Sequence, residues 1–232
     1  MDNRGEECYQ PMQLLKDDNK QKNIDEKNLI LAIKDVSVTI HTGGFIILLG
    51  SPGNGNITLL NILSGLIQPT EGTVRYKGEN IANWTEKQLS DFRLHFGYRI
   101  QMGKLFPNLT VLENIELAFT FTKLSEAEIH ERSVALIEMA DLTHIMDDFS
   151  EKLSNGKQLC VSIVQALINR PTAIFADAPT QNLDEPDAKS LMTFLKAIQA
   201  SGISVILATH KSDLTPFATH VIQIRAGRLV KI

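Results

Sequence analysis

A glycine-rich loop between two apolar segments is the first feature of the sequence that could do chemistry. An apolar run at 45–49 leads into GSPGNG at 50–55, and large apolar residues then recur at helical spacing over 58–66. Backbone N–H groups of such a loop can surround a phosphate, and the N-terminus of the following helix attracts its charge. The spacing of Gly50, Gly53 and Gly55 therefore predicts a phosphate-binding geometry, whose alternative is a tight turn that serves packing alone.

The side chains after this loop are not those that phosphate and metal binding use. A Lys and then a Ser or Thr usually neutralise the phosphates and hold Mg²⁺, whereas this chain has Asn56 and Ile57. Asn56 carries no charge and Ile57 has no oxygen. The nearest hydroxyl that a metal ion could recruit is that of Thr58.

The rest of the pattern predicts an α/β fold with a mainly parallel sheet covered by helices. Strands are expected over 45–49, 94–101, 172–176 and 203–208, with a hairpin arm at 73–77. Helices are expected over 58–66, over 156–169 and from Asp184 and Pro186 onward. Between the strand-rich halves a helical insert is expected over about 104–150, with Thr110 as a helix cap and a capping box at Ser125 and Glu128.

Residues 1–28 have a different composition and predict a loosely held leader with one edge strand around 12–15, so that residues 29–232 form the main domain. The net charge of −4 gives no footprint for a nucleic-acid backbone. Cys8 and Cys160 are too few for a disulfide scaffold, and the histidines show no metal-ligand spacing. The low cysteine content is typical of a reducing compartment and so favours a cytoplasmic protein, and no apolar run approaches the roughly 20 residues that span a bilayer.

Further motifs follow one another in the second half of the chain. They are LSNGKQ at 153–158, AIFADAPT at 173–180, NLD at 182–184 and ATH at 208–210. Together with the glycine loop and Gln101 at an expected strand end, they strongly resemble the nucleotide-binding subunits of ABC transporters, from about residue 31 to residue 232. Segments 106–114 and 176–184 are most similar to the lipoprotein-release, macrolide-export and cell-division branch of that family.

The resemblance implies a P-loop NTPase-type mainly parallel sheet with an antiparallel β arm and an inserted helical subdomain, and ATP with Mg²⁺ as ligands. It implies that the glycine loop, Thr58 and Asp177 hold the nucleotide, that Gln101 couples the site to the helical insert, and that His210 senses the γ-phosphate. Two chains form each site, so that one chain's loop faces its partner's signature residues, which here are Ser154, Asn155, Gly156 and Lys157. Asp184 lies in the loop at the dimer contact.

This sequence departs from the family at the residues that do the chemistry. An acidic residue that orients the attacking water follows the family's equivalent of Asp177, and here Ala178 stands in that place. Asn155 and Lys157 replace the Gly and Gln of the signature. The family's aromatic platform for adenine is expected near residues 20–22, which contain no aromatic side chain. The resemblance therefore implies a degenerate, catalytically inactive site.

Our main interpretation is a degenerate cassette subunit at the cytoplasmic face of the inner membrane, paired with an active paralogue or a second copy and with ABC transmembrane subunits. A second interpretation is an active homodimeric ATPase for lipoprotein or small-molecule export, with Thr58 serving Mg²⁺. A third is a non-transport regulator that keeps the fold as an interaction surface. Asp177 and Asp184 also have structural interpretations, as a hydrogen-bonding carboxylate and as a helix cap.

Overall fold

The computed structural model describes residues 12–15, 32–99, 105–120 and 124–230. Its larger sheet has six strands in the order β10-β9-β3-β8-β7-β6. They are β3 (Phe45–Leu49), β6 (Phe96–Arg99), β7 (Ala173–Asp177), β8 (Ser204–Thr209), β9 (His220–Arg225) and β10 (Arg228–Val230). All neighbouring pairs are parallel except β9 with β10. The predicted α/β fold with a mainly parallel sheet is confirmed.

The smaller sheet is antiparallel and has the order β2-β1-β4-β5. It contains β1 (Met12–Leu15), β2 (Val38–Ile40), β4 (Thr73–Tyr76) and β5 (Glu79–Asn80), so the predicted hairpin arm is confirmed. The prediction of an edge strand within the leader is wrong, because β1 pairs with β2 on one side and with β4 on the other. Its two neighbours come from distant parts of the chain, and the four residues of β1 alone cannot indicate such pairing.

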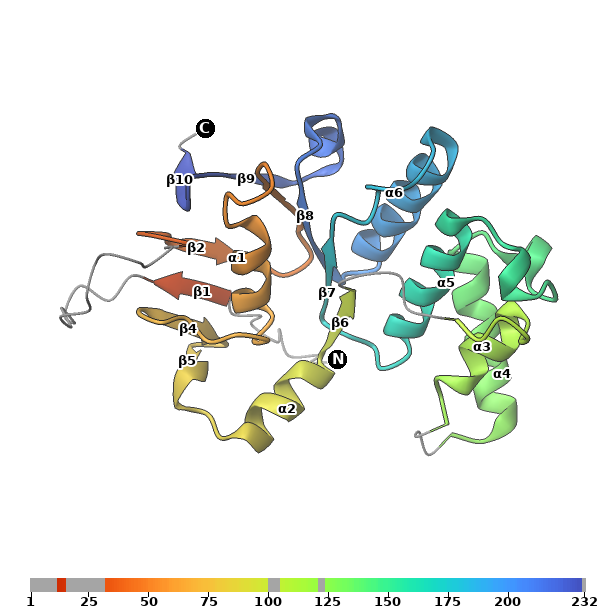
Figure 1. Cartoon of the computed structure of the whole chain (residues 1–232). Coiled ribbons are helices and arrows are strands. Elements are labelled where there is room, and N and C mark those ends of the chain that lie inside the picture. Colours follow the sequence, from red (N-terminus) through yellow and green to blue (C-terminus); the bar gives the residue numbers. More distant parts are fainter. Residues whose placement is uncertain (1–11, 16–31, 100–104, 121–123, 231–232) are drawn as a thin grey trace, which may run out of the picture.

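Helices cover both faces of the larger sheet (Figure 1). On one face α1 (Asn56–Leu63) and the smaller sheet pack against Ile46, Leu48 and Ile206. On the other face α5 (Asn155–Leu167) and α6 (Glu185–Ala200) pack against Ile47 and Val205. The alternation of β3 side chains between these two clusters explains why this strand is apolar throughout.

The structure contains further elements that the sequence pattern did not predict. Helix α2 (Glu86–Leu94) begins with a capping box formed by Thr85 and Gln88. Because this helix continues to Leu94, β6 starts later than the predicted residue 94. The hairpin of β9 and β10 was not predicted either. Among the described residues, no helix is long and apolar enough to cross a membrane.

Helices α3 (Val111–Leu117) and α4 (Glu126–Met139) lie beyond α5, and both predicted starts are confirmed (Figure 1). Thr110 Oγ1 accepts a hydrogen bond from the Glu113 amide at 3.1 Å, and Ser125 Oγ accepts one from the Glu128 amide at 3.4 Å. Short 3₁₀ turns follow at Thr143–Ile145 and Ser150–Lys152.

One buried amide organises the loop that precedes α3. Asn114 is fully buried, and its Oδ1 accepts a hydrogen bond from the Phe106 amide at 2.8 Å. Its Nδ2 lies within 3.1 Å of the carbonyl oxygens of Phe106, Leu109 and Thr110. The Asn114 carboxamide therefore links the loop to the first turn of α3, and it shares these carbonyl oxygens with other donors of the chain, such as the Leu109 and Ser150 amides.

We expect Asn114→Ala to lower the free energy of unfolding by about 2–4 kcal/mol, because it removes the four hydrogen bonds of a fully buried side chain and opens a cavity. Asn108→Ala is the matched control, since Asn108 lies in the same loop with its side chain exposed. Urea denaturation followed by circular dichroism measures both variants. Equal free energies of unfolding for the two variants would contradict the role given to Asn114.

Candidate functional site

The glycine loop connects β3 to α1 at the carboxyl end of the larger sheet. Its first amide, from Gly50, donates to the Thr209 carbonyl oxygen of neighbouring β8 at 2.9 Å. Gly53 and Gly55 have φ angles of +83° and +96°, which other residues rarely adopt. Gly55 ends the loop, and α1 therefore begins at Asn56, two positions before the predicted start.

The Asn56 side chain turns back into this loop. Only 5% of Asn56 is exposed, and its Nδ2 donates to the carbonyl oxygen of Gly50 at 3.2 Å. The carboxamide thus closes the loop from within and uses its donor on the protein's own backbone. A ligand that used the Asn56 amide would have to displace the Gly50 carbonyl oxygen from it.

The side chains of the loop lack the groups that usually hold a triphosphate with its metal ion. Segment 50–58 contains no charged side chain, so only its backbone N–H groups and the N-terminus of α1 can face phosphate oxygens there. Ile57 is 41% exposed and presents a methyl-bearing surface next to the loop. Thr58 is half-buried and supplies the hydroxyl nearest to that position.

Three segments contact one another beside the glycine loop, namely residues 32–35, Asn54 and the turn at 226–227. We call this group of residues the clasp. Asn54 Oδ1 accepts from the Ala226 amide at 3.2 Å, and the Gly227 amide donates to the Asn54 carbonyl oxygen at 3.1 Å. The Lys34 amide donates to the Gly227 carbonyl oxygen at 2.7 Å. The Ala32 carbonyl lies so close to Gly55 that an added Cβ there would be 2.1 Å from its oxygen.

Asp177, Ala178 and His210 stand at the carboxyl ends of β7 and β8. These strands are neighbours in the sheet, and β8 pairs with β3, so the three residues lie at the same sheet edge as the loop. Burial raises the pKa of the Asp177 carboxyl, which makes no hydrogen bond to any described residue. The His210 side chain is exposed.

Ala178 itself supplies no general base. Ala178 has a φ of +39°, and its amide donates to the Ala208 carbonyl oxygen at 2.8 Å. A cation that the sequence reasoning missed lies close by, because Lys211 Nζ donates to the Thr180 carbonyl oxygen at 2.8 Å. Because Lys211 directly follows His210, the sequence could have indicated that this cation lies near the candidate site.

The signature residues form the first turn of α5. Ser154 is exposed, and its Oγ accepts from the Lys157 amide at 3.3 Å. The Gly156 amide donates to Asp187 Oδ2 of α6 at 3.2 Å, and a Cβ at Gly156 would lie 2.4 Å from Asp187 Cγ. Asn155 is exposed, as the first residue of the helix. The first turn of α5 is therefore already capped by the chain's own side chains.

Asp184 and Asp187 explain the junction of α5 with α6. Asp184 Oδ1 accepts from the Asp187 amide at 2.9 Å, so Asp184 caps α6 as its position before Pro186 indicates. Burial, with the nearby Asp187 carboxylate, raises the pKa of the Cys160 thiol to about 12. Asp187 was missed by the sequence reasoning, because its contact with Gly156 depends on helix packing.

Two predicted features lie outside the described residues, namely Gln101 and the segment 20–22. Within the described ranges, no group of three or more His, Cys, Asp or Glu side chains could hold a metal ion.

Comparisons with known proteins agree with this architecture. A family model described as ABC transporter matches residues 33–181. An ABC transporter ATP-binding protein of Methanocaldococcus jannaschii is 37% identical over 203 residues, which are 87% of this chain and 91% of that protein. The chain belongs to the ABC transporter ATP-binding family. A macrolide export ATP-binding/permease protein, MacB 1 of Yersinia pestis, is 34% identical over 88% of this chain, and this chain spans 32% of its length.

Solved cassette structures have the same fold. The ATP-binding cassette MJ0796, in a dimeric post-hydrolysis state bound to ADP and phosphate, has a TM-score of 0.77 and 31% identity over 95% of this chain and 97% of its own. The cbiO1 protein of Clostridium perfringens, part of the transporter complex cbiONQ, has a TM-score of 0.84 and 25% identity over 96% of this chain and 88% of its own. Proteins of this family thus bind ATP and dimerise, as the bound ADP and the dimer of MJ0796 illustrate.

The clasp predicts different costs for two alanine substitutions in the glycine loop. Both Gly53 and Gly55 have positive φ, so Ala at either position costs about 1–2 kcal/mol of backbone strain. Gly55→Ala also collides with the Ala32 carbonyl, whereas the space around Gly53 is open. We expect Gly55→Ala to lower the free energy of unfolding by at least about 1 kcal/mol more than Gly53→Ala, measured by denaturant titration. Equal costs would mean that segment 32–35 does not cover the loop.

Proposed function

We propose that this chain is the ATP-binding-cassette subunit of a membrane transport complex and that its own nucleotide site does not hydrolyse ATP. The observation that carries this proposal is the buried Asn56 carboxamide, which donates to the Gly50 carbonyl oxygen at 3.2 Å and closes the loop. A neutral, internally bonded side chain thus stands where the phosphate charge requires a cation.

The chemistry of phosphoryl transfer supports the same proposal. Positioning and charge stabilisation supply most of the rate, through a loop Lys, Mg²⁺ and a group that orients the nucleophile. Asn56, Ile57 and Ala178 remove the cation, the metal ligand and the water-orienting carboxylate together. If each loss costs about 2–4 kcal/mol and about 1.4 kcal/mol is a factor of ten, hydrolysis in this site falls by several powers of ten.

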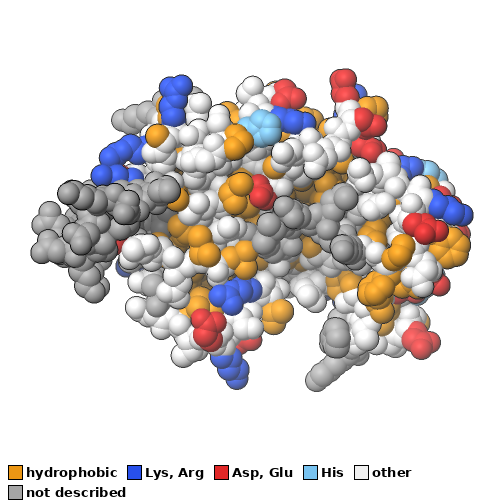
Figure 2. All heavy atoms as spheres, in the orientation of Figure 1, with side chains coloured by type: hydrophobic (Ala, Val, Ile, Leu, Met, Phe, Trp, Pro, Cys, Tyr) orange, Lys and Arg blue, Asp and Glu red, His pale blue; other side chains and the backbone are white. Residues whose placement is uncertain are grey.

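We further propose that the chain acts with an active cassette paralogue and with transmembrane subunits at the cytoplasmic face of the membrane. The dimeric cassette MJ0796 and the permease portion of MacB 1 support this proposal by kinship. Phe106, Leu117 and Phe149 are between 42% and 54% exposed, and Figure 2 shows apolar side chains over this helical end of the molecule. Such exposed apolar groups favour a protein partner there.

The signature side is the part of this chain that a partner's nucleotide could use. The exposed Ser154 hydroxyl is open to a partner, whereas the Gly156 amide is already bonded to Asp187. In the proposed heterodimer, one composite site contains Asn56 and Ala178 and is inactive. The other combines the partner's phosphate loop with Ser154 and hydrolyses ATP.

The isolated chain should not hydrolyse ATP above background, and calorimetry with and without Mg²⁺ should detect no Mg²⁺-dependent ATP binding. Ala178→Glu alone should remain inactive, because the loop still lacks its cation and metal hydroxyl. The matched comparison is the triple variant Asn56→Lys, Ile57→Ser and Ala178→Glu, which is the minimum that should restore hydrolysis. A Mg²⁺-dependent turnover of the unmodified chain, abolished by Asp177→Ala, would instead support an active ATPase in which Thr58 serves the metal.

In the complex purified from membranes with its partners, Ser154→Arg should lower ATPase or transport activity strongly, because it places a bulky cation at the partner's phosphate. Ser90→Arg is the matched control, since Ser90 is exposed on α2. Asn56→Ala should leave activity nearly unchanged. If Ser154→Arg and Ser90→Arg both leave activity intact, neither composite site uses this chain. A failure to recover membrane subunits with it would favour the non-transport regulator.

A further inference from the structure

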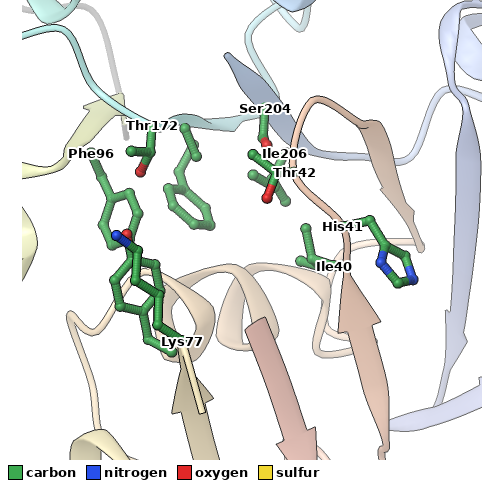
Figure 3. Close-up of a pocket in the computed structure, with 11 residues that line it drawn as sticks. Ile40, His41, Thr42, Lys77, Phe96, Thr172, Ser204 and Ile206 are labelled. Atoms are coloured by element: carbon green, nitrogen blue, oxygen red, sulfur yellow. The ribbon is translucent and has the colours of Figure 1, made fainter. Parts of the chain in front are cut away.

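A groove lies between α6, the first turns of α5 and the end of α4 with the loop after it (Figure 1). Residues from 139–144, 156–160 and 187–197 line it, and we call it the α6 groove. Its volume is about 420 Å³, within the roughly 300–1,000 Å³ that is usual for small-molecule sites. A cavity between the two sheets, which Phe96 and Ile206 help to line, has a volume of about 50 Å³, below the roughly 150 Å³ that holds one aromatic ring (Figure 3). Of these two hollows, only the α6 groove has room for an organic ligand.

One end of the α6 groove is basic. Helices α5 and α6 start side by side there, because the Gly156 amide of α5 donates to Asp187 Oδ2 of α6 at 3.2 Å. Lys157 and Lys189 line the groove within the first two turns of these helices. Lys157 Nζ lies 3.4 Å from His144 Nε2, so an imidazole and an ammonium group share this end of the groove.

The positive charge at this end has no partner among the described carboxylates. Neither Lys157 nor Lys189 forms an ion pair with a described residue. The acidic residues that line the groove are Asp141 and Asp187, and Asp187 is already held by the Gly156 amide. The two ammonium groups are therefore available to an acidic group that enters the groove.

The rest of the groove is lined with apolar groups. Phe194 and Cys160 form part of its floor and are 4% and 5% exposed, whereas Met139 on the α4 side is 40% exposed. Ala197 lies eight residues beyond Lys189 on the same helix, which is about 12 Å along the groove at 1.5 Å per residue. The groove therefore changes from basic to apolar along its length, and apolar atoms of a ligand would gain free energy by covering its apolar part.

We propose that the α6 groove binds a small organic anion that combines one acidic head group, a carboxylate or a phosphate, with a short apolar body. The head group lies between Lys157 and Lys189, and the apolar body covers Phe194 and Met139. Such a ligand contacts the helical insert, the first turns of α5 and α6 at once, and so holds these three elements together. The glycine loop precedes α1 on the opposite face of the larger sheet, so this binding is independent of nucleotide.

Methyl NMR on the full chain, labelled at methionine ε positions, tests this binding with hexyl phosphate and hexanoate as probes. Either anion should shift the Met139 resonance in a saturable way, with a Kd of about 1 mM or below. The Met192 methyl, which is 1% exposed and does not line the groove, should stay in place as the internal control. Hexanol and hexylammonium have the same alkyl chain without the negative charge, and should bind about ten-fold more weakly. Equal binding of hexanol, or no saturable shift of Met139 with either anion, would overturn the proposal.

Charge variants test the head-group end. The double variant Lys157→Gln and Lys189→Gln should raise the Kd of both anions about ten-fold, because two ion pairs of roughly 1 kcal/mol or less are lost. Lys87→Gln is the matched control, since Lys87 is exposed on α2 and far from the groove in sequence. The anion that binds more tightly identifies the head group as phosphate or carboxylate. An unchanged Kd in the double variant would overturn the proposal.

A filling variant tests the apolar part without a change of charge. Thr193 lines the groove from α6 and is exposed, so Thr193→Phe should weaken the binding of both anions by filling the space of the apolar body. Ser90→Phe, at an exposed position of α2, is the matched control, and circular dichroism checks the fold of both variants. An unchanged Kd in Thr193→Phe would contradict binding in the groove. A Met139 resonance that changes with protein concentration without any probe would assign the groove to a second copy and also overturn the proposal.

Discussion

The pairing of β3 with β8 on one side and β9 on the other is the constraint on which the molecule depends. Five consecutive apolar residues, 45–49, place alternate side chains in the two core clusters, and so join the helices on one face to the antiparallel arm on the other. Since β3 is held on both edges, its carboxyl end is fixed, and the Gly50 amide meets the Thr209 carbonyl oxygen there. The glycine loop follows β3 at this end, and Asp177 and His210 lie at the same ends of the neighbouring strands β7 and β8.

Groups of the glycine loop and of the signature residues are bonded to other parts of the same chain. The Asn56 carboxamide bonds to Gly50, and the Gly156 amide bonds to Asp187. Both contacts involve groups that the resemblance assigns to phosphate. Such internal contacts stabilise the fold, because each of these polar groups has a partner within the chain.

Much of the fold could be predicted from local patterns, because strand 45–49, the capping boxes at Thr110 and Ser125, and the helix start at Asp184 are short-range features. The sequence could also predict which chemical groups the loop lacks. It could not predict that Asn56 turns inward, since this depends on where the Gly50 carbonyl points after folding. The sequence could not predict the position of β1 inside its sheet or the contact of Gly156 with Asp187 either, because each joins segments that are far apart in the sequence. Helix α2 was not predicted, because only Leu89 and Phe92 on it are buried and the apolar pattern is therefore weak. Its capping box at Thr85 was the signal in the sequence that could have indicated it.

The clasp around Asn54 has a mechanical consequence. The turn at 226–227 holds Asn54, the same turn holds Lys34, and Arg228 forms an ion pair with Asp35 at 2.9 Å. Segments from near both ends of the chain thus share their hydrogen bonds with the glycine loop, so these parts form one cooperative unit for local opening. Thermal opening of the β9–β10 hairpin would then release Asn54 and segment 32–35 together, and so loosen the glycine loop at the opposite end of β3 from its pairing with the start of β8.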